Sequence, residues 1–492
     1  MKKRIVVMTG SFNPLTKAHV DVLKQAVDAV DAEKGLFVTS SEVALIKKTV
    51  IKVKTRTPFR LTEETRREIL RSVSQDDPRL GYGGTEDNNP SGATARALKR
   101  LLREYPGYEL YYICGADKLE EIPKWTGIGE MFDKVYVLVF RRDGSDVETE
   151  LQSDFWQSHR DHVKIIDLDG DSGDISSTRV RELFMADKDY RALVPPSAYA
   201  ILSRFTPNGF PPLTAEQIIE ASIKYGGSFG KSGARSLVYR NNRDRFKNWD
   251  EELFGDRHAH LDAKVYRKPV TVDTADRRVD SVTECVNADC VDYAERMISN
   301  KFNPVIINLA SGIEPCGKYH DNGYSPEENL CYASTLSQVL YRFGDEKKNC
   351  VKASGVDHIE TLYPIGEGVG IYAPRVRFFR KNEKGYYGLR DKPFDCAVIT
   401  VSYQQNTSEN IRTALNIALD NGHDSVVIGI SDPCGYDPEK AAGHFADVLK
   451  ENGLNYKFDR VIFAVNEGKG SKRKPTGYAG KFAPFYRILK SL

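Results

Sequence analysis

The first segment able to do chemistry lies at residues 9–19, which read TGSFNPLTKAH and stand between an apolar run and a helical pattern. Gly10 allows a ligand to approach the backbone closely. Backbone N–H groups and the positive end of a helix suit a phosphate group. His19, in the first helical turn, could donate a hydrogen bond to a phosphoryl oxygen as negative charge develops there. Taken alone, the segment is better explained as a strand–helix turn with a capping histidine.

A second segment favours phosphate binding over a simple strand–helix turn. Residues 174–181 read DISSTRVR and combine hydroxyl side chains for a helix N-cap, free backbone donors and two arginines. This combination is typical of a phosphate cradle. Lys47 and Lys48 either add positive charge to the same phosphates or form a solvated surface.

The elements that must position these segments alternate along the first 206 residues. Apolar and β-branched runs predict strands at 4–9, 108–114, 134–140 and 162–168. Helical spacing predicts helices over 20–30, 93–104 and 196–205. Such alternation predicts a parallel α/β sheet with helices on both faces. The turn-forming residues that follow predict a linker at 207–213.

The two segments together resemble the motifs GxFxPx(H/T)xxH and ISSTxxR of the nicotinamide/nicotinate mononucleotide adenylyltransferases, a family within the Rossmann-like nucleotidyltransferases. The resemblance implies that His19 contacts the ATP phosphates and that Arg181 helps to hold the β- and γ-phosphates. The other implied contacts with ATP or the mononucleotide are Gly10, Ser11, Phe12, Asn13, Thr16, Lys47, Gly115, Asp117, Trp125, Arg142, Ser176, Ser177 and Thr178.

The implied reaction makes NAD and pyrophosphate. The phosphate of nicotinamide mononucleotide attacks the α-phosphorus of ATP in line, so the protein positions substrates and stabilises charge without a covalent intermediate. Mg²⁺ is expected to arrive with ATP, and no metal site of the protein is expected. Trp125 matches the aromatic residue that stacks on the pyridine ring. Thr16 stands where bacterial members usually carry histidine and eukaryotic types carry threonine, and the choice between amide and acid substrates stays open.

A second α/β series occupies the rest of the chain. Strands are expected at 305–309, 396–403, 425–430 and 460–465, and the helical patterns run over 326–342, 409–421 and 438–451. Residues 214 to about 300 are more polar, and we expect them to wrap the second core. The strands at 305–309 and 425–430 each lead into a glycine-containing loop that could hold a diphosphate.

The second series resembles the microbial-type poly(ADP-ribose) glycohydrolases, a macrodomain family, with its core over about 268–492. The family pattern is an Asn-φ-Ala-Ser strand, a Pro-Gly-Gly-Gly loop and a Gln-Glu-Glu helix start, and the twelve-residue step from Pro315 to Glu327 fits it. The resemblance implies that Glu328, with Glu327 beside it, is the general acid. The implied ADP-ribose contacts are Asn308, Ala310, Ser311, Cys316, Gly317, Lys318, Gly435 and Tyr436.

Departures from this pattern leave two hypotheses for the second domain. Cys316-Gly317-Lys318 replaces the triple glycine, so two side chains are expected to enter the diphosphate loop. Pro326 replaces the glutamine, and the loop at 431–436 is about two residues short. The domain is therefore expected either to hydrolyse an ADP-ribosylated substrate or only to bind ADP-ribose.

Composition excludes several other classes of protein. The 71 Lys and Arg residues nearly balance the 69 Asp and Glu residues, which indicates no specific nucleic-acid partner. No apolar run reaches the roughly 18 residues that a membrane span needs. The eight cysteines form no CxxC pair, so a reduced, cytoplasmic protein is expected. Residues 226–232 mimic a phosphate-binding P-loop one residue too short, and His159 with His162 lacks further metal ligands.

The sequence as a whole predicts a two-domain α/β protein. Residues 1–206 are expected to form a Rossmann-like nucleotidyltransferase parallel sheet, and residues 214–492 a macrodomain-like α/β sandwich. The expected ligands are ATP, nicotinamide mononucleotide, and ADP-ribose or an ADP-ribosylated substrate.

Overall fold

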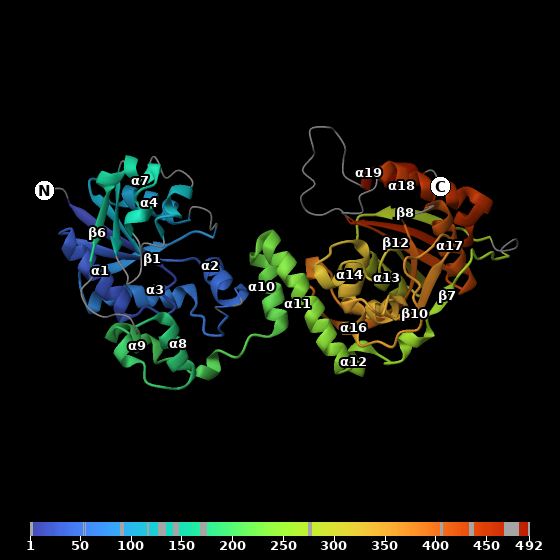
Figure 1. Cartoon of the computed structure of the whole chain (residues 1–492), viewed down its shortest axis with the longest axis horizontal. Coiled ribbons are helices and arrows are strands. Elements are labelled where there is room, and N and C mark those ends of the chain that lie inside the picture. Colours follow the sequence, from blue (N-terminus) through green and yellow to red (C-terminus); the bar gives the residue numbers. More distant parts are fainter. Residues whose placement is uncertain are drawn as a thin grey trace. The chain divides into compact units, whose positions relative to one another are not determined.

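The computed structural model describes residues 3–52, 54, 56–88, 93–115, 118–125, 134–140, 147–167, 175–273, 278–403, 407–431, 437–466 and 482–490. The chain divides into two compact units, residues 1–214 and residues 215–492. Each unit has its own sheet. Figure 1 shows the two sheets with their helices.

The sheet of the first unit is entirely parallel in the order β3-β2-β1-β4-β5-β6. Its strands are β1 (Arg4–Gly10), β2 (Lys34–Thr39), β3 (Leu80–Thr85), β4 (Glu109–Gly115), β5 (Val135–Phe140) and β6 (Val163–Ile166). The predicted parallel sheet is confirmed, with β2 and β3 in addition to the expected strands. The strand order reverses between β1 and β4, and ligands of such sheets bind beyond the carboxyl ends of the strands at that point.

Helices cover both faces of the first sheet because its strands bury side chains on alternate sides. One face packs against α1 (Lys17–Ala29), α3 (Glu63–Ser72), α8 (Ser177–Met185) and α9 (Pro196–Leu202). The other face packs against α4 (Ala93–Glu104), α6 (Val147–Glu150) and α7 (Asp154–Ser158). The short helix α2 (Glu42–Ile46) follows β2.

The segment expected to be a linker begins inside the first unit. Residues 207–209 form a single 3₁₀ turn. The Phe210 ring then stacks 4.7 Å from the Phe59 ring and lies 5.8 Å from the Phe184 ring. Through these contacts the half-buried Phe210 packs against the first core, so that core extends beyond residue 206.

The second sheet is mixed, in the order β7-β10-β11-β9-β12-β13-β8. Its strands are β7 (Lys264–Tyr266), β8 (Val282–Val286), β9 (Pro304–Ala310), β10 (Gly370–Arg380), β11 (Leu389–Ser402), β12 (Ser425–Ser431) and β13 (Arg460–Asn466). The β7·β10 and β10·β11 pairs are antiparallel, and the other pairs are parallel. The central strand β9 therefore ends beside the end of β11.

Two helical layers make this unit an α/β sandwich, as predicted. One layer holds α11 (Gly227–Lys247), α13 (Cys290–Ser299), α14 (Pro326–Ala333) and α15 (Leu336–Leu340). The other holds α17 (Thr407–Asp420), α18 (Pro438–Lys450) and α19 (Phe482–Leu489). The remaining helices are α10 (Ala215–Tyr225), α12 (Glu251–Phe254) and α16 (Asn349–Ser354).

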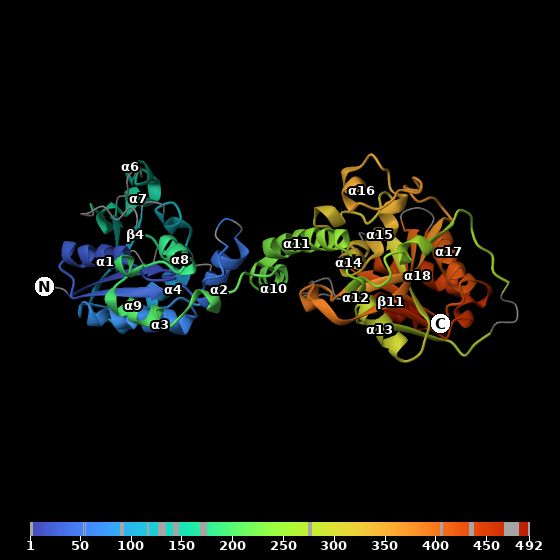
Figure 2. The same ribbon diagram turned by 90° about the horizontal axis from the view of Figure 1, so that it is seen from below.

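Two local features differ from simple periodicity. The helix expected over 326–342 breaks after Ala333, where Ser334 forms a β-bridge with Phe378. The P-loop-like residues 226–232 fall at the start of α11, which lies beside α14 (Figure 2). Among the described residues, no helix has both the length and the apolar character to cross a membrane.

Candidate active sites

The loop from β1 to α1 is shaped by side chains that face inward. The Phe12 ring lies over Gly10, the last residue of β1. A Cβ on Gly10 would lie 3.0 Å from this ring, so glycine leaves the room that the ring occupies. Phe12 is 2% exposed. Asn13 donates to the Phe59 carbonyl at 3.1 Å and accepts from the Leu61 N–H at 2.9 Å. The Phe12 and Asn13 side chains thus position the loop and do not line it.

Thr16 and His19 form the N-terminal cap of α1. His19 Nδ1 lies 2.7 Å from Thr16 Oγ1 and accepts from the Thr16 backbone N–H at 3.1 Å. A backbone N–H can only donate, so Nδ1 carries no proton here. The proton of the neutral ring is therefore on Nε2. Thr16, which is fully buried, acts by fixing this tautomer and ring orientation.

The start of α8 docks onto the same loop. Ser177 Oγ donates to the Pro14 carbonyl at 2.8 Å, and Arg181 Nη1 donates to the Asn13 carbonyl at 2.9 Å. Arg181 Nη2 also donates to Thr178 Oγ1 at 2.9 Å. Ser176 caps the helix by accepting the N–H of residue 179 at 3.1 Å. The two segments singled out in the sequence are therefore one site.

Positive charge collects around this loop. Lys48 Nζ lies 3.5 Å from Ser11 Oγ, and in the part of the chain that the structure describes Lys48, not Lys47, is the lysine bonded to the loop. Burial lowers the pKa of Lys48, and the positive charges of Arg181, Lys52 and Lys118 lower it further. Burial also lowers the pKa of Arg181. An anion bound among these groups would relieve their mutual repulsion.

Arg66 was not identified from the sequence and ties the loop to the end of β2. Its side chain is fully buried. Nη1 donates to Thr39 Oγ1 at 2.6 Å, to the Ser40 carbonyl at 2.7 Å and to the Ser11 carbonyl at 3.3 Å. The sequence could have indicated its burial, because Arg66 stands three residues before Ile69 on the same, buried face of α3.

Trp125 lies toward the carboxyl ends of β1 and β4. Its half-buried ring meets the Tyr112 ring edge-on, with centroids 5.8 Å apart and an interplanar angle of 61°. The Tyr112 hydroxyl lies 3.3 Å from Thr9 Oγ1, at the end of β1. Gly115 ends β4. Asp117 and Arg142 lie outside the described residues.

In the second unit, the predicted site residues gather at the end of β9. Asn308 is 1% exposed and donates from Nδ2 to Thr400 Oγ1 at 3.1 Å. Its Oδ1 is buried and has no hydrogen-bond partner among the described residues. Ala310 ends the strand, and Ser311 Oγ accepts the N–H of residue 313 at 3.4 Å. Gly435 and Tyr436 lie outside the described residues.

The expectation that Cys316 would enter the diphosphate loop is wrong. The residue has φ 61°, and its side chain is fully buried in the core with Cys331. Burial raises the pKa of the Cys316 thiol well above its usual value. Of the two side chains that replace glycines of the family loop, Cys316 and Lys318, only Lys318 is exposed. The Lys318 backbone N–H donates to Glu328 Oε1 at 2.8 Å.

The long helix α11 braces this loop, which the polar sequence of the region did not predict. Arg235 Nε donates to the Asn322 carbonyl at 3.0 Å. Asn242 Nδ2 donates to the Tyr319 hydroxyl at 3.2 Å and to the Tyr332 carbonyl at 3.0 Å. Residues 319–323 are thus held between α11 and α14.

Comparisons with known proteins assign a family to each part of the chain. Residues 7–183 match the cytidylyltransferase-like family, and residues 242–381 match the catalytic domain of microbial-type PARG, poly(ADP-ribose) glycohydrolase. The chain joins a cytidylyltransferase-like domain to a microbial-type PARG catalytic domain. The resemblances found in the two sets of motifs are thereby confirmed.

Individual relatives extend these matches. A "probable nicotinate-nucleotide adenylyltransferase" of Clostridium tetani is 25% identical over 206 residues, which are 42% of this chain and 98% of the relative. A Mycoplasma pneumoniae protein named "probable nicotinate-nucleotide adenylyltransferase/Ap4A hydrolase" is 25% identical over 30% of this chain and 41% of its own length. The solved PARG structure from Thermomonospora curvata has a TM-score of 0.38 at 19% identity and covers 52% of this chain and 99% of that chain.

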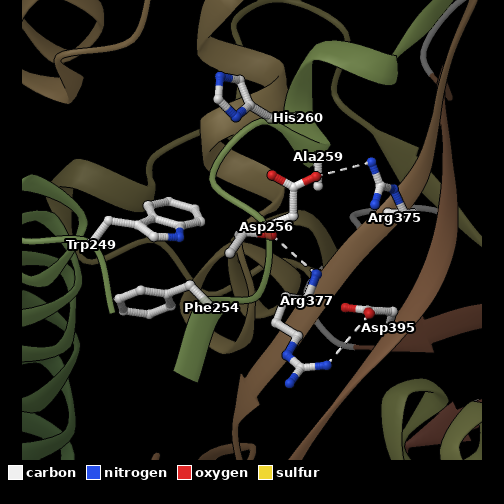
Figure 3. Close-up of a pocket in the computed structure, with 9 residues that line it drawn as sticks. Trp249, Phe254, Asp256, Ala259, His260, Arg375, Arg377 and Asp395 are labelled. Atoms are coloured by element: carbon white, nitrogen blue, oxygen red, sulfur yellow. Dashed lines mark hydrogen bonds and ion pairs between the residues drawn. The ribbon is translucent and has the colours of Figure 1, made fainter. Parts of the chain in front are cut away.

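The PARG-type domain also contains a charged hollow that none of the predicted site residues line (Figure 3). Its cavity volume is about 30 Å³, and it lies beside the rings of Trp249 and Phe254. Its charges pair with one another: Arg375 Nη2 lies 3.3 Å from Asp256 Oδ2, and Arg377 Nη1 lies 3.4 Å from Asp395 Oδ2. The ion pair between Asp256 and Arg375 connects the segment after α12 to β10.

Proposed function

We propose that the cytidylyltransferase-like domain transfers the adenylyl group of MgATP to nicotinamide or nicotinate mononucleotide. The products are the dinucleotide and pyrophosphate. One observation carries the proposal: the β1–α1 loop and the start of α8 meet at the strand-order reversal, with Lys48 and Arg181 beside them. This arrangement suits the polyphosphate of a nucleotide.

The chemistry follows from that geometry. The mononucleotide phosphate attacks the α-phosphorus, and the bond to the bridging oxygen of the leaving pyrophosphate breaks. The Nε2–H of His19 donates to a phosphoryl oxygen, and Arg181 and Lys48 stabilise the pyrophosphate. Mg²⁺ enters as part of the substrate, held by phosphate oxygens and water. The described residues contain no group of three or more acidic, His or Cys side chains arranged to hold a metal.

Trp125 is proposed to stack on the pyridine ring. The bacterial relatives reported above are named for the nicotinate substrate, whereas Thr16 follows the eukaryotic motif, so both mononucleotides belong in every assay. The cationic pyridinium ring of either substrate would be attracted to an indole face.

We expect Trp125→Ala to raise the KM for the mononucleotide about 10- to 100-fold while leaving the KM for ATP within about threefold. Stacking of an aromatic residue on a base-like ring contributes about 1–3 kcal/mol. Steady-state kinetics with each substrate varied in turn measure the effect. Trp249→Ala in the other domain is the matched control. Equal increases in both KM values would mean that Trp125 only supports the core.

For the PARG-type domain, we propose hydrolysis of ADP-ribosylated substrates, with the acid supplied from the Glu327–Glu328 pair. Support comes from the burial of both carboxyl groups beneath the loop that follows β9. Binding of ADP-ribose without hydrolysis is the second candidate, favoured by Lys318 and Pro326 at positions where the family has glycine and glutamine. ADP-ribose is a part of NAD, so one chain would make the dinucleotide and process ADP-ribosyl groups derived from it.

A reducing, cytoplasmic location is proposed from the thiols. The cysteines of the described residues form no disulfide with one another, which suits a compartment where thiols stay reduced.

A further inference from the structure

The groups proposed for the chemistry of the cytidylyltransferase-like domain lie where its site would hold phosphates. Lys48 Nζ lies 3.5 Å from a serine hydroxyl of the β1–α1 loop. Arg181 donates to the Asn13 carbonyl and to Thr178 Oγ1, each at 2.9 Å, and these neutral oxygens leave its charge available to a ligand. His19 holds its proton on Nε2, because Nδ1 accepts a backbone N–H. All three groups suit the oxygens of a polyphosphate.

The contact proposed for the pyridine ring comes from another part of the fold. Trp125 follows β4, and its half-buried ring meets the Tyr112 ring edge-on, with centroids 5.8 Å apart. The Tyr112 hydroxyl lies 3.3 Å from Thr9 Oγ1 on β1. The indole is proposed to bind the ring of the mononucleotide and takes no part in the transfer of the adenylyl group. Different elements therefore supply the ring contact and the phosphate contacts.

The dinucleotide made by this domain and ADP-ribose, the product proposed for the PARG-type domain, differ at one position. Both contain an adenosine, two phosphates and a second ribose. ADP-ribose carries a hydroxyl group where the dinucleotide carries the pyridine ring. The phosphate oxygens that His19, Lys48 and Arg181 are proposed to contact are therefore present in both molecules.

The charge of the site also suits ADP-ribose. Without the cationic pyridinium ring, ADP-ribose has one more net negative charge than the nicotinamide dinucleotide. Burial lowers the pKa of Lys48, and the charges of Arg181, Lys52 and Lys118 lower it further. A more negative ligand would relieve more of this repulsion. The contact that ADP-ribose lacks is stacking on Trp125, and its loss raises a KM about 10- to 100-fold.

We propose that the cytidylyltransferase-like domain also converts ADP-ribose and pyrophosphate into ATP and ribose 5-phosphate, and that Trp125 is what makes the dinucleotide the better substrate. The inference rests on the adenylyl transfer proposed above, run in reverse with ADP-ribose in place of the dinucleotide. An oxygen of pyrophosphate attacks the phosphorus atom that is bonded to adenosine. The bond from that phosphorus to the bridging oxygen breaks, and the oxygen leaves with ribose 5-phosphate. One phosphoric anhydride is exchanged for another, so neither water nor an oxidant is consumed.

The same residues act in this reaction. Arg181 and Lys48 hold pyrophosphate, and the Nε2–H of His19 donates to an oxygen of the transferred phosphoryl group. Pyrophosphate is the product of dinucleotide synthesis, and ADP-ribose is the product proposed for the PARG-type domain. The chain would thus recover, as ATP, the adenylyl group of the ADP-ribose that it releases. The two domains need not touch, because both small molecules diffuse in water.

The test measures ATP formation by the full chain with Mg²⁺ and excess pyrophosphate. NAD, its nicotinate analogue and ADP-ribose are varied in separate reactions. ATP is detected with luciferase and ribose 5-phosphate by chromatography. From ADP-ribose we expect equal amounts of ATP and ribose 5-phosphate, with a kcat within about tenfold of that for the better dinucleotide and a KM about 10- to 100-fold higher.

Trp125→Ala separates the two kinds of substrate. It should lower kcat/KM for the dinucleotides about 10- to 100-fold and leave that for ADP-ribose within about threefold, because ADP-ribose has no ring to stack. His19→Ala should lower kcat for both by about two to three orders of magnitude. Trp249→Ala in the other domain is the matched control and should change neither. Equal falls for both substrates in Trp125→Ala would overturn the role given to the indole.

Failure of this inference and failure of the proposed adenylyl transfer give different results. ATP from a dinucleotide but none from ADP-ribose, up to about a hundred times the dinucleotide KM, would overturn the inference and leave the adenylyl transfer in place. ATP from none of the three substrates would refute both. ATP formed from ADP-ribose at the wild-type rate by His19→Ala would place that activity outside this site and would also overturn the inference.

Discussion

We expect His19→Ala to lower the turnover of adenylyl transfer by about two to three orders of magnitude, the range typical of removing a donor to developing charge. Thr16 fixes His19 Nδ1 as an acceptor, so the lost group is the Nε2–H. The capping interaction with Thr16 is also lost, and it costs about 1 kcal/mol of stability. The Tm should therefore fall only slightly while kcat collapses.

Three variants check this result by coupled detection of pyrophosphate. His320→Ala, an exposed histidine in the other domain, is the matched control and should be unchanged. His19→Asn keeps a side-chain N–H and should recover part of the lost rate. Wild-type turnover in His19→Ala, or a loss explained by unfolding, would remove His19 from the mechanism.

Gly317→Ala should weaken ADP-ribose binding about thirtyfold or more. The residue has φ 51°, where a side chain costs about 1–2 kcal/mol. Its Cβ would also lie 2.5 Å from Glu328 Oε1, so the Glu328 carboxyl group, which accepts the Lys318 N–H, must shift. Overpacking of this kind costs about 1–3 kcal/mol, and each 1.4 kcal/mol is about tenfold in affinity.

Calorimetry with ADP-ribose, followed by the release assay, measures this effect. Gly443→Ala is the matched control, because a Cβ there has nothing within 4 Å and alanine suits its helix. Unchanged affinity in Gly317→Ala would place ADP-ribose elsewhere in the domain. Strong binding by the wild type with no release would establish the non-catalytic alternative.

Much of the fold could be predicted because continuous apolar runs mark buried parallel strands. The runs that became β1, β4, β5 and β6 were long enough to recognise. The strand β2 was missed because it begins with Lys34 and Gly35, which leaves only Leu36, Phe37 and Val38 as an apolar run, and β3 was missed because it contains Gly81, Gly83 and Gly84. Propensity depends on such local composition, whereas pairing with a neighbouring strand decides the structure.

The candidate sites were predictable where residues are adjacent in sequence. Spacing placed His19 and Arg181 in motifs, but it could not show that Arg181 reaches the Asn13 carbonyl. Arg66 and Asn242 act through contacts with distant segments. Cys316 looked like a residue of the diphosphate loop, but its positive φ and burial place its side chain in the core. Contacts between distant segments depend on tertiary structure.

The most direct test of the central claim follows the label of [α-³²P]ATP. The full chain is incubated with Mg²⁺ and, in separate reactions, nicotinamide and nicotinate mononucleotide. We predict that the label moves into a dinucleotide with one or both, with one pyrophosphate released per dinucleotide, and that neither forms without the mononucleotide. Label that stays in ATP with both substrates, or that appears only as AMP, would contradict the proposed adenylyl transfer.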